Sequence, residues 1–79
     1  MPRYYFHLHG RAARLKDEEG MRLPDAEAAW FQAVRSGREI IRAERRLGFG
    51  WDDQAIEIAD QEGLPVDQLP LAEIARFAL

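Results

Sequence analysis

The sequence predicts a small α+β domain with elements in the order β-β-α-β-β-α, in which an antiparallel sheet packs on one long helix and a short helix ends the chain. Two observations predict this order. Residues 26–47 carry a single apolar stripe at helical spacing. The pattern LPDAEAA at 23–29 returns as LPLAEIA at 69–75, and each copy follows a short acidic turn, DEEG or DQEG. We therefore expect two strand-turn-strand-helix units within a single domain of residues 1–79.

The first strand is predicted at residues 3–9, where aromatic and apolar residues alternate as in a half-buried strand. Its two faces carry Tyr4, Phe6 and Leu8 on one side and Tyr5, His7 and His9 on the other. Gly10 interrupts the pattern, and residues 13–16 are expected to pair back as a short second strand. DEEG then supplies a turn before residues 21–23. The first third of the chain is thus a hairpin or a small meander.

A long helix is predicted from Ala26 to Leu47. Asp25 can accept the free N–H groups of its first turn, and Gly48 suits a left-handed stop. Gly37 lies on the apolar stripe, where a glycine costs about 1 kcal/mol relative to alanine. We therefore expect a strand or an aromatic ring to approach the helix closely at this position.

A second hairpin and a short helix complete the predicted domain. Residues 55–60 alternate as a strand, and residues 64–69 can pair back across the DQEG turn. Pro65 removes a ladder N–H, which places this second strand at a sheet edge or beside a bulge. Pro70 suits the first turn of the terminal helix. Each D-x-E-G is thus expected to close a hairpin, and each LPxAExA to end a strand and begin a helix.

The composition, 47% hydrophobic and 32% charged, is that of a globular chain with a packed core. The predicted core combines the inward faces of the strands with the apolar stripes of the helices. Its members are Tyr4, Phe6, Leu8, Leu15, Leu23, Trp30, Val34, Ile40, Ile41, Ile56, Ile58, Val66, Leu69 and Ile74. A domain this small buries only about 60% of its unfolded surface. A partner chain would therefore add stability.

Composition also limits the classes of function. The chain has no cysteine, which excludes disulfides, thiol nucleophiles and thiolate metal sites. No apolar run approaches the roughly 20 residues of a membrane span, and the opening MPRYYFHLHG lacks the apolar core of a signal peptide. A net charge of -3 argues mildly against broad nucleic-acid binding. We expect a cytoplasmic protein that binds no membrane and no cofactor.

Three motifs together resemble a family of small, mostly bacterial proteins catalogued as domain of unknown function 6894 (DUF6894). They are the opening MPRYYFHL, the DEEG with LPDAEAA after it, and IEIADQEG followed by LPLAE. The resemblance spans nearly the whole chain and implies one domain in a bacterial cytoplasm, with no established activity. His7 falls on the Phe-His position of the family pattern. His9 and the connection GFGW have no counterpart in that pattern, so any role for them would be particular to this sequence.

His7 and His9 lie two residues apart on one face of the predicted strand. A carboxylate from the first acidic turn, Asp17 or Glu18, could join them as a third metal ligand. The set lacks the fixed spacing of zinc motifs, and a solvated or helix-covered strand face explains it better, so we predict no metal site. The histidines could also act as a general base, but no nucleophile accompanies them, because the only serine, Ser36, lies within the long helix. We therefore expect no catalytic residue and no enzymatic activity.

Five arginines form a basic band along the second half of the long helix. They are Arg35, Arg38, Arg42, Arg45 and Arg46. Such a band can bind the phosphates of nucleic acid. Cations near a helix C-terminus also offset the helix dipole, and Glu39 can pair with neighbouring arginines, so a solvated face is the favoured interpretation. An antitoxin-like or other regulator that contacts nucleic acid through this band remains the alternative function.

Aromatic side chains outside the predicted core offer a surface for a partner. Phe31 lies at the edge of the helical stripe, and Trp51 lies in a loop. Phe77 and Leu79 belong to the apolar tail. We predict that Trp51, Phe77 and Leu79 bind a partner. Small size, an edge strand and the apolar tail favour a non-catalytic assembly or protein-binding module, as a homodimer or with another protein.

Overall fold

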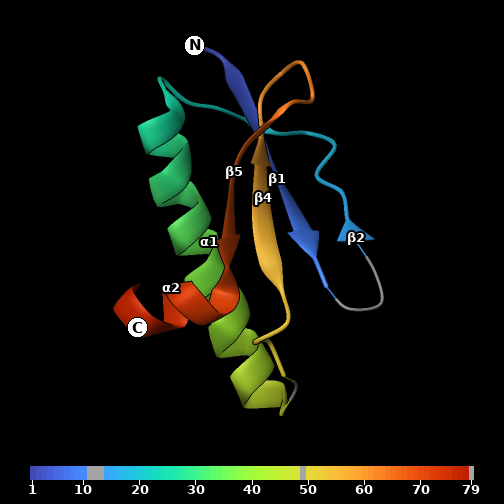
Figure 1. The fold of residues 1–79 in the computed structure, drawn as a ribbon, viewed down its shortest axis with the longest axis vertical. Helices are drawn as coiled ribbons and strands as arrows, with labels where there is room; N and C mark the ends of the chain where they lie inside the picture. Colours follow the sequence, from blue (N-terminus) through green and yellow to red (C-terminus); the bar gives the residue numbers. More distant parts are fainter. Residues whose placement is uncertain (11–13, 49, 79) are drawn as a thin grey trace.

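The computed structural model describes residues 1–10, 14–48 and 50–78 of the chain (Figure 1). Within these residues the elements follow in the order β-β-β-α-β-β-α. Their bounds are β1 (Arg3–His9), β2 (Arg14–Leu15), β3 (Met21–Arg22), α1 (Ala26–Leu47), β4 (Ala55–Ala59), β5 (Pro65–Pro70) and α2 (Leu71–Ala78). The predicted α+β class, the long helix and the short C-terminal helix are confirmed. The strand β3 is one element more than the predicted order contains.

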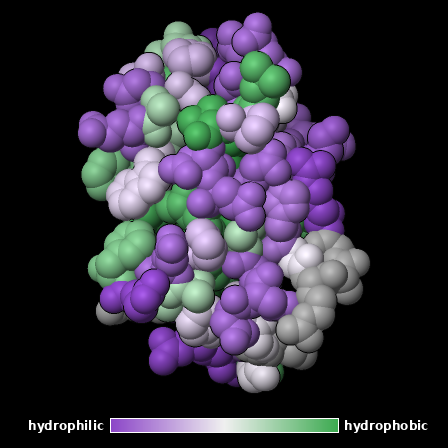
Figure 2. Space-filling view, viewed as in Figure 1, coloured by the Kyte–Doolittle hydropathy of each residue, from purple (hydrophilic) through white to green (hydrophobic). Residues whose placement is uncertain are grey.

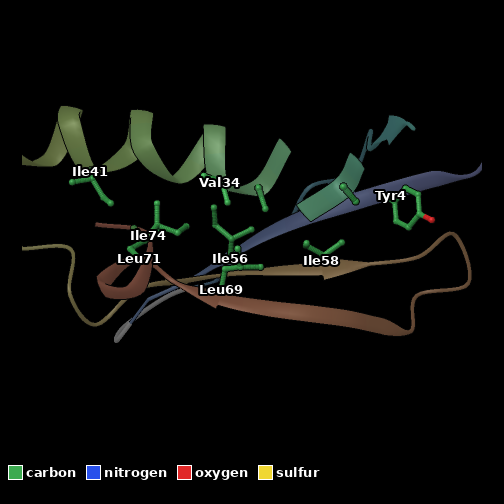
Figure 3. Close-up of a cluster of buried hydrophobic side chains, with 10 residues drawn as sticks. Tyr4, Val34, Ile41, Ile56, Ile58, Leu69, Leu71 and Ile74 are labelled. Atoms are coloured by element: carbon green, nitrogen blue, oxygen red, sulfur yellow. The ribbon is translucent and has the colours of Figure 1, made fainter. Parts of the chain in front are cut away.

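The sheet is antiparallel, with β2, β1, β4 and β5 side by side and β3 paired to β1. In its centre, Phe6 of β1 lies opposite Ile58 of β4, and both pack in the core. α1 covers the face of the sheet that carries Ile58 (Figure 3). The next pair along the strands is His7 with Glu57. Because successive side chains alternate, this pair lies on the outer face, away from α1.

The strand β5 forms one edge of the sheet, as the proline at its start predicts. Its register with β4 shifts between Ile58 and Ala59, where Pro65 enters the ladder. A proline has no N–H to donate, and the irregularity removes the need for one. Both the edge position and the irregularity predicted for Pro65 are therefore confirmed.

The first acidic turn does not close a hairpin, so that prediction is wrong. β2 pairs with the end of β1 and β3 with its start, which makes the DEEG turn a bridge between two short strands on the same edge of β1. In the gap between them, the Asp17 carboxylate accepts the N–H of Phe6 at 3.1 Å. A side chain thus replaces the ladder partner that a continuous hairpin would supply. The DQEG turn does close the hairpin of β4 and β5.

The ends of α1 follow the sequence closely. Asp25 accepts the N–H of Ala28 at 2.9 Å, and Gly48 ends the helix with φ at 83°, in the left-handed region. Gly37 is buried where the predicted close approach occurs. A Cβ at this position would lie 2.5 Å from Cδ1 of Ile74 on α2 and 3.4 Å from Cδ1 of Ile56 on β4, so the expected strand approaches here and α2 approaches more closely still.

The core lies between α1, the inner face of the sheet and α2 (Figure 3). Its buried hydrophobic residues are Tyr4, Ala29, Ala33, Val34, Ile41, Ile56, Ile58, Leu69, Leu71 and Ile74. Other predicted core residues pack against this cluster and are partly buried, namely Phe6, Leu8, Leu23, Trp30 and Ile40.

Two predicted core residues are exposed, and the core cluster contains Ala29, Ala33 and Leu71, which were not among the predicted core residues. Leu15 is 66% exposed because β2 is the outermost strand, at the edge of the sheet opposite β5. Val66 is 41% exposed, since its separation of three residues from the inward Leu69 points it to the outer face. Leu71 is fully buried as the first residue of α2, and its N–H bonds to the carbonyl of Gln54 at 2.9 Å.

Candidate functional site

A shallow cleft of about 470 Å³ lies between the turn of residues 17–20 and the turn of residues 60–63. Tyr5 and His7 line it from the outer face of β1. Its charged side chains are mostly acidic and comprise Asp17, Glu18, Asp60 and Glu62 with the single base Lys16. Both turns lie in the upper part of the view in Figure 1. Of the two histidines considered in the sequence, His7 lines this cleft.

The first residue of β1 ties both turns to the sheet. The Arg3 guanidinium donates from Nη1 to the carbonyl of Glu19 at 2.7 Å. The backbone N–H of Arg3 donates to Oε1 of Gln61 at 3.3 Å. Arg3 thus holds both turns, which form the walls of the cleft, through one hydrogen bond to each.

Asp17 holds the first turn against β1 through both of its oxygens and its backbone. Oδ1 accepts the N–H groups of Glu19 at 3.2 Å and Gly20 at 3.1 Å, which is the hydrogen bonding of an Asx turn. Oδ2 accepts the N–H of Phe6, and the N–H of Asp17 donates to Nδ1 of His7 at 3.0 Å. Neutral His7 therefore carries its proton on Nε2.

The electrostatics of this cluster fix its charge states near neutral pH. Burial alone would raise the pKa of the Asp17 carboxyl, but the N–H groups that it accepts, led by that of Gly20, hold this pKa below its ordinary value. His7 is only 6% exposed. Burial, followed by the Arg14 guanidinium, lowers the pKa of His7, whereas the Glu57 and Asp17 carboxylates act in the opposite direction. Asp17 is thus ionised and His7 neutral at pH 7.

His9 has a separate partner. Its Nε2 lies 2.6 Å from Oε1 of Glu57, and the Arg14 guanidinium lies 3.7 Å from the same oxygen. Among the described residues, no three His, Asp or Glu side chains gather in an arrangement that could hold a metal ion. The two histidines therefore act in different contacts: His7 with the first acidic turn and His9 with β4.

The basic band lies on α1 as the sequence predicts. Four of its members are exposed, namely Arg35, Arg42, Arg45 and Arg46. Arg38 is half-buried, and its Nε is a buried atom without a hydrogen-bond partner among the described residues. Contact between this band and nucleic acid stays a prediction, because cations that offset a helix dipole take the same positions.

An aromatic surface, which we define as Trp30, Phe31 and Phe77, joins α1 to α2. The Trp30 ring meets Phe31 edge-on with 5.2 Å between centroids and stacks on Phe77 at 5.8 Å with 11° between the ring planes. Phe31 is 60% exposed and Phe77 is 56% exposed. In Figure 2, hydrophobic side chains, shown in green, alternate with hydrophilic ones, shown in purple, along the left side of the molecule. A groove of about 110 Å³ beside Trp30 and Phe77 also contains Asp67 and Glu73.

The predicted partner-binding residues therefore differ in how much exposed surface they offer to a partner. Phe77 belongs to the aromatic surface, together with Phe31 from the edge of the helical stripe. Trp51 packs partly buried against the core, which leaves less of its ring for a partner. Leu79 lies outside the described residues.

Sequence reasoning grouped Asp17 with His7 only as candidate metal ligands and missed their joint role in holding the turn against β1. Strand alternation placed His7 on the outer face, and DEEG predicted a turn, but no local pattern says that the turn folds back over that face. The signal available was the acid itself, since an aspartate that begins a turn commonly accepts nearby backbone N–H groups. Its additional bond to Phe6 depends on the pairing of β2 and β3 with β1, which is a tertiary feature.

Comparison with known proteins identifies the family of this chain. No helix within the described residues is long and apolar enough to cross a membrane. No curated protein and no solved structure matches the chain significantly. A family model described as "Domain of unknown function (DUF6894)" matches residues 3–72, from the start of β1 into the first turn of α2. This match includes the sheet, α1 and both acidic turns, and the chain therefore belongs to the DUF6894 family.

Proposed function

We propose that the chain is a non-catalytic protein-binding module that associates through its aromatic surface. The observation that carries the proposal is the pair of exposed rings, Phe31 and Phe77, on either side of Trp30. Aromatic anchors dominate the energetics of protein interfaces, and clustered exposed rings are uncommon on a monomer. Burial of these rings against a partner removes apolar surface from water, which stabilises the complex by about 25 cal/mol per Å² of buried apolar surface.

The polar cleft supports the non-catalytic part of the proposal. The Asp17 carboxylate accepts three backbone N–H groups, and Nδ1 of His7 accepts a fourth bond from the backbone of Asp17. Asp60 similarly accepts the N–H groups of Glu62 and Leu64, both at 2.9 Å. These groups stabilise turns. A general base, by contrast, needs a basic atom within hydrogen-bond reach of its substrate.

The exposed edge of β5 is a poor alternative site of association. Pro65 and Pro70 bound this strand and carry no N–H. The N–H of Gln68 is occupied by Oδ1 of the preceding Asp67 at 2.8 Å. Prolines and a charged residue are features by which edge strands avoid pairing with other chains. Association through side chains on the helices therefore fits the molecule better than extension of the sheet.

Light-scattering mass on size exclusion, over a range of protein concentrations, tests this proposal. Wild type is expected to form a dimer, and Phe31→Ser and Phe77→Ser to shift the mass toward the monomer. Leu15→Ser is the matched control. Leu15 is similarly exposed but lies on β2, at the edge of the sheet opposite β5 and outside the aromatic surface. A wild type that remains monomeric at every concentration, or serine variants that associate as the wild type does, would refute association through the aromatic surface.

The alternative function, nucleic-acid binding by a regulator, has one observation in its favour: four arginines of the basic band are exposed on α1. Such binding depends on phosphate contacts and weakens steeply with salt. The alternative predicts a complex with excess 260 nm absorbance at low salt that dissociates at high salt. It also predicts that Arg38→Glu and Arg42→Glu abolish the complex, so binding that is unchanged in these variants would exclude the basic band.

A further inference from the structure

A line of three exposed side chains runs along α1 through the aromatic surface. Glu27, Phe31 and Arg35 follow at four-residue spacing, and all three are exposed. Residues four apart lie on one ridge of a helix. An apolar ring therefore has a carboxylate one turn before it and a guanidinium one turn after it.

This ridge is complementary in charge to its own reversed copy. If two α1 helices meet antiparallel with the two Phe31 rings in contact, Glu27 of each chain lies opposite Arg35 of the other. A twofold axis generates this contact twice. We infer that the partner of the aromatic surface is a second copy of this chain, held by an antiparallel pairing of α1 helices centred on Phe31.

The inference rests on the proposed function and adds the occupant and its orientation. A parallel pairing centred on the same residue would instead place Glu27 against Glu27 and Arg35 against Arg35. Packing of four-residue ridges against each other brings two helices together at about 50°. At this crossing angle the contact is confined to residues near the crossing point, which is where the ring and its two charges lie.

Further charges lie on and beside the ridge. Glu39 follows Arg35 at the same four-residue spacing, and Arg76 of α2 is exposed next to Phe77. Asp67 and Glu73 line the groove next to Trp30 and Phe77. Arg38 and Arg42 continue the basic side of α1 beyond Arg35. Because these outer charges carry both signs, the orientation depends on the pairing of Glu27 with Arg35.

Charge reversal tests the pairing directly. In each of Glu27→Arg and Arg35→Glu, two attractive contacts of the dimer become two repulsive ones. We expect each single variant to raise the dimer dissociation constant by about tenfold or more at low salt. The double variant E27R/R35E restores opposite charges across the axis, and we expect its dissociation constant to return to within about threefold of the wild type. Sedimentation equilibrium measures these constants.

The matched control is Glu62→Arg, which reverses an exposed acid of the cleft, on the outer face of the sheet and away from α1. Its dissociation constant is expected to equal that of the wild type. Thermal melting at concentrations below the dissociation constant shows whether each variant folds. Glu27→Arg removes the acid from the first helical turn and weakens the helix itself, and Arg35→Glu does not reverse that loss. Recovery of dimerisation in the double variant therefore cannot come from helix stability.

Cross-linking provides a second measurement, because the chain has no native cysteine. An equal mixture of Glu27→Cys and Arg35→Cys chains is expected to form the mixed disulfide faster than either chain forms a disulfide with itself. In a parallel pairing the preference is reversed, and such a result would overturn the inference.

The outcomes separate the inference from the proposed function. If wild type dimerises and Phe31→Ser disrupts the dimer, but the single charge reversals have no effect or the double variant does not recover, the aromatic surface stands and the antiparallel pairing is wrong. If wild type never associates, both fail.

Discussion

The two acidic turns share one sequence pattern, and within each turn they share one structure. Asp17 and Asp60 each accept the N–H of the residue two positions later, at 3.2 Å and 2.9 Å respectively. Each turn ends with a glycine in the left-handed region, with φ at 68° for Gly20 and 84° for Gly63. In both turns the aspartate carboxylate accepts backbone N–H groups of the turn, and the glycine takes a positive φ. These two local features account for the shared conformation.

The turns differ in what surrounds them. Asp60 bonds within its own hairpin, where its N–H donates to the carbonyl of Leu64 and its carboxylate accepts the N–H of Leu64. Asp17 reaches β1, where it accepts the N–H of Phe6 and donates to His7. The same short motif is thus local at one site and part of the tertiary structure at the other. Local sequence specifies the conformation of a turn, and its place in the sheet decides how much stability depends on it.

Substitution of the two glycines gives the largest expected contrast. A Cβ at Gly20 would lie 2.8 Å from the backbone carbonyl oxygen of Tyr4, whereas a Cβ at Gly63 meets nothing within 4 Å. Gly63→Ala is expected to cost about 1 kcal/mol for the left-handed backbone, and Gly20→Ala about 3 kcal/mol because the clash adds to that strain. Urea unfolding followed by tryptophan fluorescence, at one fixed protein concentration, measures both. Equal costs would mean that the first turn is as free of β1 as the second.

Removal of the two aspartates gives the next contrast. Asp17→Ala deprives the N–H groups of Phe6, Glu19 and Gly20 of their acceptor, and we expect it to cost about 2–3 kcal/mol because the Phe6 group is partly buried. Asp60→Ala affects only exposed N–H groups and is expected to cost about 1 kcal/mol. Amide hydrogen exchange at Phe6 is the sharper readout. Exchange there should accelerate in Asp17→Ala and stay unchanged in Asp60→Ala.

The limits of sequence reasoning follow the same division between local and tertiary features. The ends of α1 were predictable because Asp25 and Gly48 act on adjacent backbone. The alternation of β1 was predictable because it has a fixed period. The DEEG turn was misassigned as a hairpin because its strands both pair with β1, and pairing partners leave no local pattern. The burial of Leu71 was missed because it depends on how α2 docks on α1.

The site shows this limit more strongly than the fold. Phe31 and Phe77 could be predicted as exposed aromatic residues from their distance to the apolar stripes. Their gathering around Trp30 could not, since it joins helices that are distant in the sequence.

The buried histidine at the first turn predicts a pH dependence that the second turn lacks. The pKa of His7 in the folded state is lowered from its ordinary value of 6.5, so below pH 6.5 the unfolded chain binds a proton that the folded chain does not. Stability is therefore fully present above pH 6.5 and falls as the pH drops through the folded-state pKa. Protonation of Nδ1 would also break the bond from the N–H of Asp17.

Unfolding free energies measured between pH 7.5 and pH 5 check this dependence. His7→Gln keeps an acceptor near Asp17 but cannot titrate, so its profile should be flatter than that of the wild type. His9→Gln is the control, because it leaves the contact of His7 with Asp17 in place. A His7→Gln profile with the slope of the wild type would assign the pH dependence to another group. Asp17 adds a second loss at lower pH, since its lowered pKa contributes stability above the ordinary value of 3.8 that disappears on protonation.

The smallest expected effect comes from making the two turns identical in sequence. Glu18→Gln converts DEEG into DQEG, the sequence of the second turn. Glu18 is exposed, and the turn bonds come from Asp17 and the backbone, so we expect a change within about 0.5 kcal/mol in the free energy of unfolding. The contrast between Gly20→Ala and Gly63→Ala should persist in this background. If it disappeared, the variable position of the motif would direct the turn onto β1; if it persists, the pairing of β2 and β3 with β1 does so.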